Sequence, residues 1–88
     1  MPTIAWFYGI AIRMYVKDHP PPHFHAIYGE FEANVAIATG DVIEGRLPRS
    51  AARMVKEWAL LNGPALMHNW ERARNELQPE RIVGLDAD

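Results

Sequence analysis

The first part of the chain alternates between apolar and polar residues, which is typical of strands in an antiparallel sheet. Residues 3–8 (TIAWFY) form an apolar run that ends at Gly9, a position that suits a tight turn. Residues 10–17 then alternate, with Ile10, Ile12, Met14 and Val16 on one side and Ala11, Arg13, Tyr15 and Lys17 on the other. The prolines at 20–22 cannot donate hydrogen bonds to a ladder, so we expect the sheet to pause there.

Two further alternating runs, residues 23–28 and 31–39, flank Gly29 and Glu30, and a Gly-X pair between such runs predicts a two-residue hairpin loop. The predicted pairs are Tyr28 with Phe31, Ile27 with Glu32, Ala26 with Ala33, His25 with Asn34, Phe24 with Val35, and His23 with Ala36. The side that carries Phe24 and Val35 must cover the core. We therefore expect the opposite side to be the wetter one, with the polar residues His23, His25, Glu32 and Asn34.

From Pro48 onward, the apolar residues recur at helical spacing instead. The pattern predicts helices over about 49–62 and 64–77, with Gly63 and Pro64 at their boundary, and a possible short strand over 81–85. The large aromatic residues Trp6, Phe24 and Trp58 are predicted to lie in the core. The predicted class is α+β: a single domain, 1–88, in which an antiparallel β-meander of about four to five strands within 3–47 packs on one face against two C-terminal helices.

Composition excludes several classes of protein. The absence of cysteine rules out disulfides, thiolate zinc sites and thiol nucleophiles. No stretch approaches the ~18 consecutive apolar residues of a membrane span, and the first residues do not resemble a secretion signal, so we expect a cytoplasmic protein without membrane contact.

The net charge of −2 does not favour nucleic acid as a partner. A local basic stripe could still bind a phosphate backbone or an acidic partner; it consists of Arg46, Arg49, Arg53 and Lys56.

Three of the four histidines lie in the segment KDHPPPHFHAIYGE. His23 and His25 are two apart on a strand, so their side chains point the same way and could bind one zinc or other divalent ion. His19 is the obvious third ligand, but an extended proline run would place it ~12 Å from His23 and pointing away, unless one X–Pro bond is cis. Asp18, Glu32 or a second subunit of a homodimer could complete the site instead.

The same block also allows acid–base chemistry without a metal. If residues 10–17 neighbour residues 23–28, their polar side chains share one surface with the two histidines. Histidine suits proton transfer near neutral pH, and arginine and lysine bind phosphate. This equipment fits a metal-independent ribonuclease with no required cofactor, in which the catalytic residues are His23, His25 and Tyr15 and the phosphate-binding residues are Arg13 and Lys17. The residues expected around this site are Asp18, His19, Glu32 and Asn34. A polar sheet face beside a proline turn is the simpler alternative.

The segments MPTI, GIAIRMY, DHPPPHFHAIYGE, GRLP and NW together resemble a small bacterial family, the domain of unknown function DUF4160. The block from Asp18 to His25 is the specific part of this resemblance. The resemblance implies a gene beside another small protein family of unknown function, in the manner of toxin–antitoxin pairs. On that basis we expect the toxin-like member of a two-gene module, acting on RNA and bound by a small cognate antitoxin-like protein. The alternative is a non-enzymatic metal- or partner-binding regulatory module.

Overall fold

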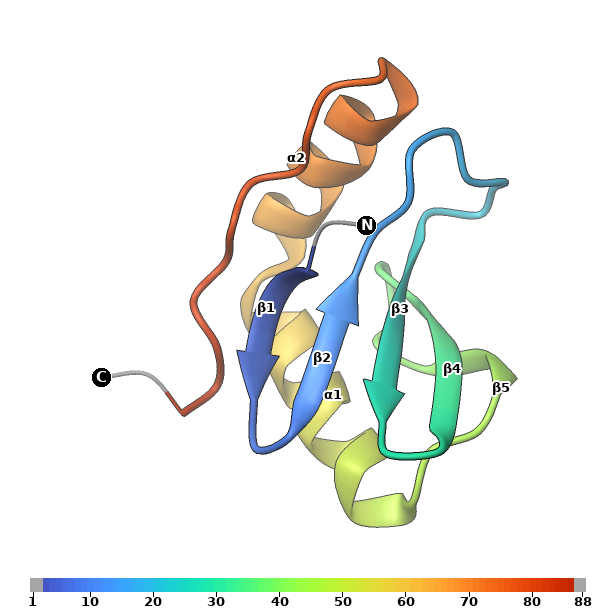
Figure 1. Cartoon of the computed structure of the whole chain (residues 1–88), viewed down its shortest axis with the longest axis vertical. Helices are drawn as coiled ribbons and strands as arrows, with labels where there is room; N and C mark the ends of the chain where they lie inside the picture. Colours follow the sequence, from blue (N-terminus) through green and yellow to red (C-terminus); the bar gives the residue numbers. More distant parts are fainter. Residues whose placement is uncertain (1–2, 87–88) are drawn as a thin grey trace.

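The chain forms five strands followed by two helices (Figure 1). The computed structural model describes residues 3–86. The elements are β1 (Thr3–Phe7), β2 (Ile10–Arg13), β3 (His23–Tyr28), β4 (Phe31–Ala36), β5 (Val42–Gly45), α1 (Arg49–Leu61) and α2 (Gly63–Arg74). The strands make one antiparallel sheet in the order β1-β2-β3-β4-β5, which confirms the predicted α+β meander with two C-terminal helices. Within residues 3–86, neither helix has the length and apolar character needed to cross a membrane.

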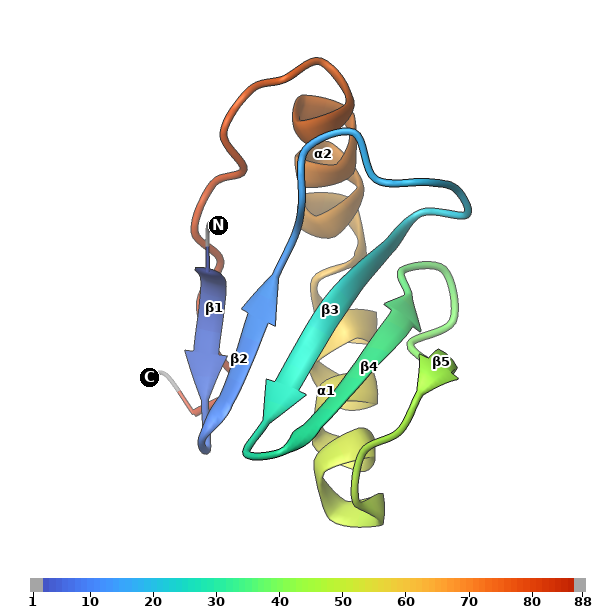
Figure 2. The same cartoon turned by 45° about the vertical axis from the view of Figure 1, so that its right-hand side comes forward.

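The hairpin of β3 and β4 has the predicted register at every pair, from His23 opposite Ala36 to Tyr28 opposite Phe31. Phe24 is fully buried on the face that both helices cover (Figure 2). There the ring of Trp58, from α1, packs 5.6 Å from the ring of Phe24 and 5.3 Å from that of Phe7. Full burial of such a side chain contributes about 1.5–3 kcal/mol, so this cluster is a main link between α1 and the sheet.

Two residues expected on the core side are exposed instead. Trp6 is 58% exposed, because the pairing of Trp6 with Ala11 places it on the sheet face opposite the helices. Val16 is 41% exposed, because β2 ends at Arg13 and the alternation does not continue as far as Val16. The prediction that Trp6 belongs to the core is therefore wrong, while the same prediction for Trp58 is confirmed.

The C-terminal segment differs from the prediction. The second helix ends at Arg74, before the predicted end at 77, and Glu76 has a positive φ of 64° that turns the chain away. Residues 81–85 do not form the predicted strand. They run beside β1, where the backbone N–H of Ile82 donates to the carbonyl oxygen of Ile4 at 2.7 Å. The segment therefore follows the edge of the sheet without joining it as a regular strand.

Two buried side chains hold this C-terminal segment in place. The Asn69 amide donates to the Glu80 carbonyl oxygen at 2.8 Å, and its own oxygen accepts the Glu80 backbone N–H at 2.7 Å. The indole Nε1 of Trp58 donates to the carbonyl oxygen of Val83 at 2.8 Å. Both helices are thus tied to the segment that covers β1.

Candidate metal centre

The candidate site lies where the loop of residues 14–22 meets the start of β3 (Figures 1 and 2). Lys17 fastens this loop to the end of α2. Its backbone N–H donates to the Ala73 carbonyl oxygen at 3.2 Å, and its Nζ lies 3.4 Å from a carboxylate oxygen of Glu76. Lys17 also has a φ of 59°, in the left-handed region, so the chain turns sharply just before Asp18. The side chain predicted to bind phosphate therefore pairs with Glu76.

His19 lies beside His23. An extended proline run would point His19 away, but the Pro20–Pro21 bond is cis. The ring of His19 lies 5.1 Å from the ring of His23, centroid to centroid. Its side chain is nevertheless 71% exposed, so it forms the outer edge of the histidine group.

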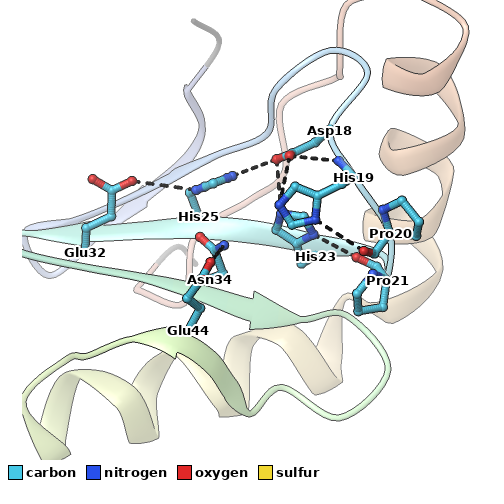
Figure 3. A network of polar contacts seen from close by, with 9 residues as sticks. All are labelled: Asp18, His19, Pro20, Pro21, His23, His25, Glu32, Asn34 and Glu44. Atoms are coloured by element: carbon cyan, nitrogen blue, oxygen red, sulfur yellow. Dashed lines mark hydrogen bonds and ion pairs between the residues drawn. The ribbon is translucent and has the colours of Figure 1, made fainter.

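Asp18 is the centre of the site (Figure 3). One carboxylate oxygen, Oδ1, accepts the backbone N–H of His19 at 2.9 Å, which fixes the orientation of the group. The other oxygen, Oδ2, lies 3.0 Å from Nε2 of His23 and 2.8 Å from Nε2 of His25. Two imidazole nitrogens from one strand therefore converge on one carboxylate oxygen from the preceding loop.

His23 is enclosed, contrary to the prediction that it lies on the wetter side of the sheet. Its side chain is 0% exposed. The strand places it on the predicted face, opposite Phe24, but the ring of Trp70 from α2 lies 5.4 Å away and the ring of His19 covers it as well. The prediction that His23 is on the wetter side is wrong, because the alternation along a strand gives the direction of a side chain but does not show which other elements cover it.

The hydrogen bond of His23 fixes which nitrogen carries the proton. Nδ1 lies 2.7 Å from the carbonyl oxygen of Pro21, which can only accept, so Nδ1 must be the donor. In the neutral ring Nε2 then presents a lone pair. This Nε2 is buried and, among residues 3–86, makes no hydrogen bond, because it is not aligned with the nearby oxygen of Asp18. Within the described residues, Nε2 is therefore the nitrogen of His23 that is left without a hydrogen-bond partner.

His25 has a similar arrangement with different partners. Its Nε2 is within hydrogen-bond distance of Asp18, and its Nδ1 lies 3.6 Å from a carboxylate oxygen of Glu32. The ring of Tyr15 packs against it edge-on at 4.3 Å, and the His25 side chain is only 12% exposed. Nδ1 of His25 is buried and makes no hydrogen bond among residues 3–86, so Glu32 is the nearby carboxylate but not a bonded partner.

The Asp18 carboxyl is held in its ionised form. Burial alone raises the pKa of Asp18, but a hydrogen bond from His25 and another from the backbone N–H of His19 lower it, as does attraction to the rings of His23 and His25. Together these interactions outweigh burial and hold the pKa of Asp18 below its usual range. A carboxylate that stays charged beside two imidazoles is a suitable donor for a divalent cation.

The other predicted site residues differ in whether their side chains are directed toward the histidines. Arg13 pairs with His25 across β2 and β3, so it shares the face of Tyr15 and His25 as predicted. Its Nε is buried and makes no hydrogen bond within the described part of the chain. Asn34 lies opposite His25, but its amide donates to Glu44 on β5 at 3.0 Å and so is directed away from the histidines.

The predicted basic stripe lies elsewhere. In both views α1 begins at the opposite end of the molecule from the loop of residues 14–22 (Figures 1 and 2). Lys56 pairs with Asp41 at 2.8 Å, and the guanidinium of Arg46 lies 5.4 Å from the centre of the Phe31 ring. Arg49 and Arg53 are exposed. The stripe is thus partly neutralised and is separate from the histidine group.

Three side chains form a group that could hold a metal ion. One donor atom each from Asp18, His23 and His25 lie within 4.8 Å of one another. Donors in a tetrahedral zinc site lie ~2.0–2.1 Å from the ion and therefore about 3.3 Å apart. The distances from Asp18 Oδ2 to the two Nε2 atoms, 3.0 and 2.8 Å, would have to open by only about 0.3–0.5 Å. This group contains two histidines of the predicted metal set, His23 and His25, together with Asp18, which was one of the possible further ligands.

Comparison with known proteins gives one match. Neither a search of curated proteins nor a search of solved structures found a significant similarity. A family model covers the chain from Gly9 to Glu71, which includes β2 to β5, the whole histidine block, α1 and most of α2. Because residues 9–71 of the 88-residue chain match the model described as a domain of unknown function (DUF4160), the chain belongs to that family.

Proposed function

We propose that this protein is a divalent metal-binding module, with zinc as the ion best suited to a centre formed by Asp18, His23 and His25. Two neutral imidazoles and a carboxylate are a common donor set for first-row divalent ions. The outer partners needed by such a set are also present. The Pro21 carbonyl holds His23, Glu32 faces His25, and the backbone N–H of His19 holds Asp18.

The observation that carries the proposal is the convergence of two imidazoles on one carboxylate oxygen. Nε2 of His23 lies 3.0 Å from Oδ2 of Asp18 inside the protein, while its Nδ1 donates to the carbonyl oxygen of Pro21. Because Nε2 of His25 approaches the same oxygen at 2.8 Å, one cation at this point would satisfy all three donors.

A zinc titration tests the proposal. We expect wild-type protein to bind one equivalent of Zn²⁺ by calorimetry. The variants Asp18→Asn and His25→Ala should each bind at least about tenfold more weakly, since loss of even an outer-shell partner costs ~10–100-fold. His68→Ala is the matched control, because His68 is a histidine on α2 whose side chain is 59% exposed and that is not among the three donors. Equal binding by wild type and Asp18→Asn would refute the site.

A second candidate, the toxin-like ribonuclease, is favoured by one observation. Arg13, Tyr15 and His25 share one face of the sheet, where a phosphate could contact the guanidinium beside an imidazole. The enclosure of His23 does not support its direct proton transfer to a substrate. An RNA substrate, a small cognate partner and a cytoplasmic location rest on the family resemblance and the composition. Growth arrest on expression that His25→Ala abolishes, while Asp18→Asn retains it, would favour this candidate over the metal centre.

A further inference from the structure

A third imidazole lies next to the proposed centre. Nε2 of His19 is 3.8 Å from Oδ1 of Asp18, and its Nδ1 is 3.2 Å from the carbonyl oxygen of Pro20. All three histidines therefore have the same orientation: Nε2 faces Asp18, and Nδ1 faces an oxygen acceptor (Figure 3). An exposed surface histidine has no need of this orientation, because water satisfies both nitrogens.

We infer that His19 is the fourth ligand of the metal, and that metal binding draws its exposed ring inward to close the site. This inference rests on the proposed metal-binding function. Nε2 of His19 lies 3.8 Å from Oδ1 of Asp18, whereas the other two imidazoles approach Oδ2. His19 is not among the three residues whose donor atoms lie within 4.8 Å of one another, so its ring has to move inward to reach an ion held by them. Its exposure leaves the ring free to make that movement.

The charges around the group suit the four-ligand site. Three neutral imidazoles and one carboxylate leave a divalent ion with a net positive charge. Glu32, 3.6 Å from Nδ1 of His25, supplies a carboxylate close to that charge without being a ligand. Nδ1 of His25 makes no hydrogen bond within residues 3–86, so a closer approach of Glu32 would pair the outer nitrogen of this ligand with an acid and increase its basicity.

A four-ligand centre has a different role from a three-ligand one. Catalytic zinc sites keep one position open for water or substrate, whereas structural sites are closed by four protein donors. With His19 bound, the ion would join the loop to β3 and fix residues 18–22 against the end of α2, where Lys17 already contacts Ala73. The metal would therefore fix the conformation of this loop, and the occupied site would have no position for a substrate.

Cobalt binding to three proteins tests the inference: wild type, His19→Ala and the control His68→Ala. Co²⁺ in a four-coordinate tetrahedral site absorbs visible light strongly, and it absorbs weakly with five or six ligands. We expect strong bands for wild type and His68→Ala. For His19→Ala we expect weaker bands and an affinity for Co²⁺ and Zn²⁺ lower by at least about tenfold. Added imidazole should restore the bands of His19→Ala, which a purely structural effect of the substitution would not allow.

The role of His19 as a ligand and the three-residue centre can be refuted separately. Binding by His19→Ala with the wild-type affinity and the wild-type Co²⁺ spectrum would show that His19 is not a ligand, while the three-residue centre would stand. Failure of wild type to bind either metal would remove both. Folding is not in question for His19→Ala, because the side chain is 71% exposed, and circular dichroism checks this directly.

Discussion

Replacement of His23 by leucine separates the metal-binding role of this residue from its contribution to packing. His23→Leu keeps a buried side chain of similar size against Trp70. Without metal, the variant loses the 2.7 Å hydrogen bond to Pro21, which contributes about 1 kcal/mol net. It also removes a buried nitrogen that makes no hydrogen bond, and burial of such a group costs about 1–3 kcal/mol. The two effects oppose each other, so we expect the two proteins to differ in stability by only about 1 kcal/mol in a chelator.

Addition of metal should separate the two proteins. A ligand at 100 times its dissociation constant stabilises the folded state by about 2.7 kcal/mol. In a domain of this size, 1 kcal/mol shifts the melting temperature by roughly 4–8 °C, so wild type should gain roughly 10–20 °C. His23→Leu should gain little, because it has lost a donor.

The assay is thermal unfolding by circular dichroism in a chelator and in excess Zn²⁺, for both proteins. The informative quantity is the difference between the two melting temperatures under each condition. We expect this difference to widen by roughly 10–20 °C when metal replaces the chelator. A difference of the same size in both conditions would refute the reasoning, because His23 would then act through packing alone.

Three further substitutions probe other parts of the molecule. Glu32→Ala removes the carboxylate nearest to Nδ1 of His25, which would pair with that nitrogen in the metal-bound state, so competition titrations should show a loss of Zn²⁺ affinity of about 10–100-fold; unchanged affinity would exclude that role. Lys56→Met removes the hydrogen bond that holds the pKa of Asp41 below its usual range, so that pKa should rise in an NMR titration. Because the folded-state pKa of Asp41 is depressed, its contribution to stability is present above the unfolded value of about 3.9 and is lost as the pH falls through the folded value. The pair is exposed, so the melting temperature at neutral pH should barely change, and a large drop would contradict this view. Asn69→Ala removes two hydrogen bonds to the C-terminal segment and should cost about 1–3 kcal/mol. Hydrogen exchange of residues 80–85 should become faster in this variant, and unchanged protection would mean that other contacts hold the segment.

The fold could be predicted where local chemistry determines it. Gly29 and Glu30 specify a two-residue loop, and a loop of that length fixes which residues of β3 and β4 face each other. Gly63 and Pro64 likewise marked the boundary between α1 and α2 correctly. The end of α2 was less predictable, because the apolar spacing continued to Leu77 although that residue is exposed.

The site was only partly predictable. The spacing of His23 and His25 placed both on one face, and the sequence showed Asp18 nearby. The distance from Asp18 to the imidazoles depends on the turn at Lys17 and on the path of the proline loop, and neither follows from an alternating pattern. The cover that Trp70 gives to His23 was missed for the same reason, since it depends on where α2 crosses the end of the sheet. No signal in the sequence connected these two residues.

The candidate donors all lie between residues 18 and 25. Groups so close along the chain lose little loop-closure entropy when they gather around one ion. In the nascent polypeptide all of the candidate donors therefore emerge before β4 or either helix has been synthesised. Under the proposed function an ion could meet its donors at that stage, whereas the contact of Lys17 with Ala73 and the cover by Trp70 form only with α2.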